Sequence, residues 1–106
     1  MLRKELLSKA AEITEGARQK HYGSPEDNFK NIAEFWQLYL SQRFENTDES
    51  EISPTDVAIM MLLMKVARLV HDPHHDDSWL DIAGYAACGS QCAEASSKCA
   101  EASSDE

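Results

Sequence analysis

The sequence predicts an all-α domain in which four helices form a bundle. Apolar residues recur at helical spacing along most of the chain, two Ser-Pro-x-acid segments mark helix starts, and no useful stretch shows the alternation of a strand. A chain of 106 residues and 11.9 kDa has the size of one small domain. Because a domain this small buries a limited core, we expect oligomerisation to complete the bundle.

The first two helices are predicted over residues 2–20 and 25–43. In the first, Leu2, Leu6, Ala10, Ile13 and Ala17 share one face, and Gly23 follows its end. The second begins at "SPED", where a Ser can cap the helix, Pro suits the first helical position and an acid suits the helix dipole. Its predicted core residues are Phe29, Ile32, Ala33, Trp36 and Leu40.

The third and fourth helices complete the predicted domain, residues 1–88. A second signal, "SPTD", starts a helix over residues 54–70 that is apolar on nearly all sides, which predicts the central buried helix. After the loop "HDPHHDD", the fourth helix starts near Asp77 or Ser78 and continues at least to Cys88, with Trp79, Ile82, Ala83 and Ala86 predicted as core. Residues 89–106 contain the near-repeat "CAEASSK", "CAEASSD" and form either a helical extension or a disordered, low-complexity tail.

Composition narrows the classes of function. The net charge of −9 argues against direct nucleic-acid binding, which needs clustered Lys and Arg, and suits the binding of cations or metal–nucleotide complexes. The most apolar stretch, residues 57–70, is too short to span a membrane and contains Lys65 and Arg68. Together with the lack of a signal-peptide pattern and of a disulfide framework among the three cysteines, this predicts a cytoplasmic protein.

Lys65 and Arg68 are the most informative residues, because two cations in an apolar helix are costly unless they are paired. Asp77 and Asp81 lie on one face of the next helix and could pair with them. One interpretation is a pocket in which Lys65 and Arg68 bind phosphate while the carboxylates hold Mg²⁺, a cation that prefers oxygen ligands. The alternative is a purely structural set of ion pairs that locks the two helices together.

Glu34 could complete that metal site from the second helix, as carboxylates from two helices do in helical bundles. It lines up with Asp27 and Asn31 at successive turns, so the alternative is a solvated face on which Asp27 only caps the helix. The histidines of "HDPHHDD" are predicted to lie in a solvated loop rather than to bind zinc, because adjacent loop residues diverge.

Several uncommon motifs occur together and in order: "YGSPEDNF", then "W..YL", "DVAIMMLLMKVAR" and "DSWLDIAGYAA". Over residues 18–87 this pattern resembles a small bacteriophage and prophage domain of uncharacterised function. That domain is in turn distantly similar to the MazG-type all-α nucleoside triphosphate pyrophosphohydrolases. "DSWLDIAGYA" is similar to their ExxD motif, with Asp81 at the final Asp and Ser78 at the Glu position, whereas their EExxE motif has no clean match.

The resemblance implies a homo-oligomer, dimer or tetramer, in a phage-infected or lysogenic host. It implies a Mg²⁺-dependent enzyme that releases pyrophosphate from a nucleotide, with Asp77, Asp81 and Glu34 as catalytic metal ligands. Lys65 and Arg68 would bind the phosphates, and Tyr22 and Asn28 the base or sugar. Because the EExxE cluster is missing, the alternative is a non-catalytic protein that sequesters a nucleotide or a host protein.

Overall fold

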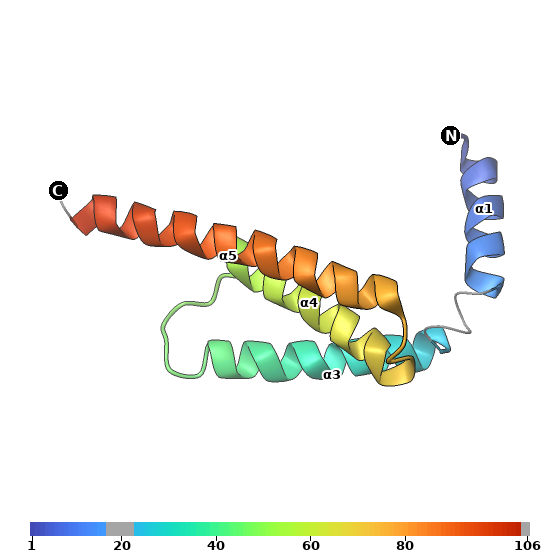
Figure 1. The fold of residues 1–106 in the computed structure, drawn as a ribbon, viewed down its shortest axis with the longest axis horizontal. Helices are drawn as coiled ribbons and strands as arrows, with labels where there is room; N and C mark the ends of the chain where they lie inside the picture. Colours follow the sequence, from blue (N-terminus) through green and yellow to red (C-terminus); the bar gives the residue numbers. More distant parts are fainter. Residues whose placement is uncertain (17–22, 105–106) are drawn as a thin grey trace.

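The computed structural model describes residues 1–16 and 23–104, with side chains through residue 98, and these residues form helices and connecting loops. Four helices follow one another: α1 (Arg3–Glu15), α3 (Pro25–Arg43), α4 (Pro54–His71) and α5 (Asp76–Ser104) (Figure 1). The all-α, four-helix prediction is therefore confirmed. The predicted bounds of the second and third helices agree closely, residues 17–20 of the first lie outside the described residues, and α5 continues through the near-repeat to Ser104.

Both predicted helix starts are confirmed in atomic detail. The Ser24 hydroxyl accepts a hydrogen bond of 3.3 Å from the backbone N–H of Asp27. At α4 the Ser53 hydroxyl accepts from the backbone N–H of Asp56 at 3.1 Å, and the Asp56 carboxylate accepts from the backbone N–H of Ser53 at 2.8 Å. This reciprocal pair is a capping box, which satisfies backbone donors that the first turn of a helix leaves without partners.

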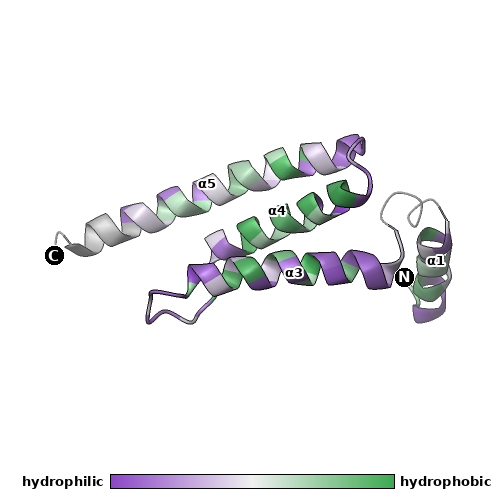
Figure 2. Cartoon of the chain, turned by 90° about the horizontal axis from the view of Figure 1, so that it is seen from below, coloured by the Kyte–Doolittle hydropathy of each residue, from purple (hydrophilic) through white to green (hydrophobic). Residues whose placement is uncertain are grey.

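The helices α3, α4 and α5 form a single layer with α4 in the middle (Figures 1 and 2). Within the described residues α4 packs against both neighbours, α3 and α5 do not touch each other, and α1 touches none of the three. The α4–α5 packing is close, since a Cβ placed on Gly89 would lie only 3.1 Å from the Cβ of Ala58. One chain thus makes an open layer and not a closed four-helix bundle.

The open layer explains why the predicted core is only partly buried. Among the described side chains Ile32 and Ala67 are the buried hydrophobic residues. The prediction that residues 54–70 form the central buried helix is right about its central position. It is wrong about burial within one chain, because both faces of a layer remain open and most apolar side chains of α4 are half-exposed. For the same reason several predicted core residues are exposed, namely Phe29, Ala33, Trp79, Ala83 and Ala86.

Polar contacts of Asp56, which is 1% exposed, hold α3 and α4 together. Its carboxylate accepts hydrogen bonds from the Tyr39 hydroxyl at 2.6 Å and from Arg43 Nε at 3.0 Å. Burial by itself raises the pKa of Asp56, but the hydrogen bonds from Tyr39 and Ser53 and the charge of Arg43 outweigh it and lower the pKa to about 2. Burial and the bond to Asp56 raise the pKa of Tyr39 to about 12, so the contact is a neutral phenol donating to a carboxylate.

None of the described helices is both long and apolar enough to cross a membrane.

Candidate functional site

One end of the layer gathers three chain segments: the start of α3, the end of α4 and the start of α5 (Figure 1). Gly23 lies against the ring of His71, where a Cβ would approach His71 Nδ1 to 3.3 Å. Its φ of +77° is a conformation that side-chain-bearing residues rarely adopt, so glycine permits this close approach of the chain entering α3. The basic residues of α4 lie in the last two turns of the helix, near this end.

The structure brings Lys65 and Asp81 together. Lys65 Nζ lies 2.7 Å from Asp81 Oδ2, and this ion pair joins α4 to α5. The Lys65 residue is only 8% exposed, whereas the Asp81 side chain is about half-exposed. The ammonium is therefore withdrawn from water, while the side chain that neutralises it is in contact with solvent.

Two further basic groups act electrostatically on the Asp81 carboxylate. The hydrogen bond and charge of Lys65, followed by the charges of Arg68 and His75, hold the pKa of Asp81 below its ordinary value. His75, the residue before α5, is half-buried, and its Nδ1 is hydrogen-bonded to the fully buried Ser78 hydroxyl at 2.8 Å. Lys65, Arg68, His75, Ser78 and Asp81 thus form one polar cluster, called here the Lys65 cluster.

Asp77 and Glu34 are the other residues predicted to bind a metal ion with Asp81. Asp77 is exposed in the first turn of α5, and Glu34 is exposed on α3. In residues 1–16 and 23–104 there is no group of three or more His, Cys, Asp or Glu placed to hold a metal ion. The magnesium site built from Asp77, Asp81 and Glu34 therefore stays a prediction.

Tyr22 and Asn28 are the two residues predicted to contact a base or sugar. Tyr22 lies outside the described residues. Asn28, in the first turns of α3, is 5% exposed, and its Oδ1 accepts no hydrogen bond from the described part of the chain. A buried amide oxygen without a partner is costly, so Asn28 offers an acceptor at the same end of the layer as the Lys65 cluster.

The histidine loop is partly as predicted. His71 and His74 are exposed, but His75 is not a solvated loop residue because its ring is bonded to Ser78. The sequence feature that could have predicted this contact is the spacing of His75 and Ser78, three residues apart across a helix start. The same spacing allows the side chains of a capping box to meet.

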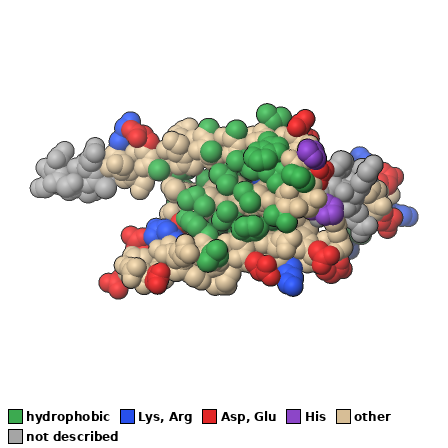
Figure 3. Space-filling view, turned by 60° about the horizontal axis from the view of Figure 1, so that its bottom comes forward, with side chains coloured by type: hydrophobic (Ala, Val, Ile, Leu, Met, Phe, Trp, Pro, Cys, Tyr) green, Lys and Arg blue, Asp and Glu red, His purple; other side chains and the backbone are tan. Residues whose placement is uncertain are grey.

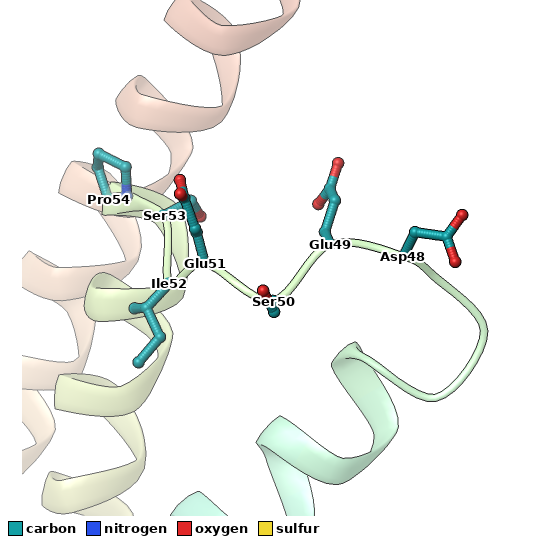
Figure 4. A pocket seen from close by; sticks show the side chains of 7 residues that line it. All are labelled: Asp48, Glu49, Ser50, Glu51, Ile52, Ser53 and Pro54. Atoms are coloured by element: carbon teal, nitrogen blue, oxygen red, sulfur yellow. The ribbon is translucent and has the colours of Figure 1, made fainter.

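Three cavities lined by described residues lie away from the Lys65 cluster. The largest, about 590 Å³, is formed by residues 48–54, whose side chains point in different directions from an open loop (Figure 4). Glu49 in this loop binds Arg43 at 3.1 Å, which gives the segment a structural role. The other two lie along α1 and along an apolar groove between α4 and α5.

The role of Asp56 was missed by sequence reasoning. Its position in the "SPTD" signal predicted only a capping residue, yet the same carboxylate also binds Tyr39 and Arg43 of α3. Tyr39 and Arg43 are four residues apart and so lie on one helical face, but nothing local shows that this face meets the start of α4.

Sequence similarity places the chain in a family that has phage relatives. Residues 5–93 match the family described as a domain of unknown function, DUF6378, and the chain belongs to this family. It is similar to the Gene 55 protein of Mycobacterium phage D29, with 45% identity over 83 residues that cover 78% of this chain and 50% of the relative. The Gene 55 protein of Mycobacterium phage L5 is 40% identical over 81 residues, which cover 76% of this chain and 47% of the relative.

The chain therefore spans about half the length of these curated relatives. No solved structure matches it. The predicted resemblance to a phage domain is confirmed, while the distant similarity to MazG-type enzymes stays a prediction.

Proposed function

We propose that this phage protein binds a nucleotide or a similar phosphorylated small molecule at the Lys65 cluster, and that binding does not require hydrolysis. The observation that carries the proposal is the contact of 2.7 Å between the buried Lys65 ammonium and the carboxylate of Asp81, whose side chain is half-exposed. Lys65 thus holds an anionic oxygen at a position close to solvent. A phosphate oxygen has the charge and the hydrogen-bonding capacity to take that position.

Arg68 and His75 support phosphate as the ligand. Both act on the same carboxylate as Lys65, so basic groups gather around this position in a protein whose overall net charge is −9. Asn28 supplies a buried acceptor near the start of α3, which suits the amino or hydroxyl groups of a base or sugar. The distant similarity to MazG-type proteins favours a nucleotide over other phosphorylated molecules.

The proposal does not include hydrolysis of the nucleotide. A magnesium-dependent pyrophosphohydrolase needs acidic side chains around the metal, and no group of three or more His, Cys, Asp or Glu among the described residues supports such a centre. Capture of a host protein is the other non-catalytic alternative, but the basic groups of the Lys65 cluster favour a phosphorylated ligand. We therefore rank nucleotide binding first.

Calorimetric titration of the full chain with a panel of NTPs and dNTPs tests the proposal. The titrations are run with and without Mg²⁺ and beside a pyrophosphate-release assay. We expect saturable binding of at least one nucleotide, no binding of its unphosphorylated nucleoside, and no turnover. A charged hydrogen bond contributes roughly 1.5–3 kcal/mol, so Lys65→Met weakens binding about tenfold or more.

Lys98→Met is the matched control, since Lys98 is an exposed lysine near the far end of α5, paired with Glu94. Failure of every nucleotide to bind, or equal affinity of wild type and Lys65→Met, would remove the proposal. Pyrophosphate release would instead identify an enzyme and would contradict the statement that the protein only binds.

A further inference from the structure

The chain exposes far more surface than a compact protein of its mass. Its accessible surface is 8054 Å², whereas the scaling of surface with mass gives about 5,900 Å² for 11.9 kDa. Its radius of gyration is 17.6 Å, against about 13 Å for a compact domain of this length. Part of the excess comes from α1 and the end of α5, which extend away from the layer (Figure 1).

The layer itself contributes the rest, and the surface that it exposes is apolar. Figure 3 shows hydrophobic side chains gathered across the middle of one view of the layer, with charged side chains toward its edges. Even the central helix α4 contributes only one buried hydrophobic residue, Ala67. A single layer of helices cannot bury its faces alone, and stable domains place a second layer over such a surface.

One face of α4 is apolar and uncharged. Ile59, Leu63, Val66 and Val70 follow one another in steps of four, three and four residues, which places them in one stripe along the helix. Each of the four is half-exposed or, at Val70, 61% exposed. Ile59 also lines the apolar groove of about 240 Å³ between α4 and α5, so the stripe continues into a shallow hollow.

The other side of α4 is less suited to burial against a protein. It contains Lys65 and Arg68, whose charges would have to be removed from water or kept paired. Burying the stripe removes no charge of α4 from solvent. The stripe is therefore the face of α4 where a second layer is accommodated at least cost.

We propose that the stripe Ile59, Leu63, Val66 and Val70 is the contact surface for a second copy of this chain. Steps of four and three residues are the spacing at which two helices interlock side chains, and a two-fold axis sets the same stripe of both copies face to face. A standard interface hides about 800 Å² on each partner, which is less than the total excess of about 2,100 Å² that the layer shares with α1 and the end of α5. Two stacked layers then bury the residues that one chain leaves half-exposed. The inference is independent of nucleotide binding.

Sedimentation velocity of the full chain at micromolar concentration, with Val70→Lys and Val57→Lys, tests this surface. The two substitutions are the same change on the same helix at similarly exposed positions, but about 220° apart around it. Wild type and Val57→Lys are expected to sediment at twice the chain mass of 11.9 kDa, and Val70→Lys at that mass. The helix dipole favours a lysine near a helix C-terminus, so Val70→Lys should leave α4 folded. Circular dichroism checks that the variant loses the dimer and not the helix.

A monomeric wild type would overturn the inference, as would a dimer that survives Val70→Lys. A third variant, Leu6→Lys, distinguishes exchange of α1 between copies, since Leu6 is an exposed apolar residue of that helix. Dissociation by Leu6→Lys but not by Val70→Lys would assign the contact to α1 and refute the proposed stripe.

Discussion

Replacing Asp56 by Asn tests how the buried carboxylate stabilises the contact of α3 with α4. Its pKa is about 2 in the folded chain, against about 3.8–3.9 in an unfolded one, and a difference of nearly two units corresponds to about 2.5 kcal/mol. Because the folded pKa is the lower one, this stabilisation is fully present above about pH 5 and is lost as the pH falls toward about 2. Wild type should therefore approach Asp56→Asn in stability across that window.

At neutral pH the same variant should lose about 2–3 kcal/mol of unfolding free energy. The substitution removes a charged acceptor from Tyr39 and Arg43, and breaking a buried pair typically costs about 3–5 kcal/mol. The lower figure applies here because Arg43 is about one-third exposed and keeps its contact with Glu49.

Urea unfolding followed by far-UV circular dichroism, at one fixed protein concentration and a series of pH values, measures both effects. Asp48→Asn is the control, because Asp48 is an exposed acid in the loop before α4. A stability difference between wild type and Asp56→Asn that does not change with pH would refute the reasoning. A loss at neutral pH no larger than that of Asp48→Asn would do the same.

Two further predictions concern α5. Asp81→Asn removes the carboxylate that competes with an anionic ligand for Lys65, so we expect calorimetry to show pyrophosphate binding several-fold more tightly. The control Asp77→Asn should leave the affinity unchanged. Weaker binding of pyrophosphate by Asp81→Asn would contradict this competition. Gly84→Ala should raise the unfolding free energy by about 0.5–1 kcal/mol, since a Cβ there meets nothing within 4 Å. Gly89→Ala should not show this gain, because its Cβ would press on Ala58 at 3.1 Å; equal gains would show that α4 and α5 are not closely packed.

The sequence predicted the helices well because their ends are local features. Ser24 and Ser53 cap the following turns through contacts within three residues, and the structure contains both. Packing was predicted less well because helical spacing shows which residues share a face but not whether another element covers it. Phe29 and Trp79 have the spacing of core residues, yet both are exposed in the layer made by one chain.

The candidate site was predictable in its central pair and not in its remainder. Two basic residues in an apolar helix required nearby anions, and Asp81 proved to be the partner of Lys65. Glu34 was predicted as a metal ligand because it aligns with Asp27 and Asn31 along one helix. This alignment does not indicate how far Glu34 lies from a residue of another helix. His75 and Ser78 joined the cluster through a turn geometry that composition does not reveal.

Calorimetric titration of pyrophosphate into wild type and Lys65→Met tests most directly whether the buried lysine is an anion site. We predict saturable binding to wild type and affinity at least about tenfold weaker in Lys65→Met, because the ligand loses a charged hydrogen bond. The variant should remain folded, since apolar replacements of buried ion-pair residues are often tolerated and the half-exposed Asp81 can be hydrated. Indistinguishable affinities of two folded proteins, or no binding to wild type, would contradict the assignment of Lys65 as the phosphate-binding residue.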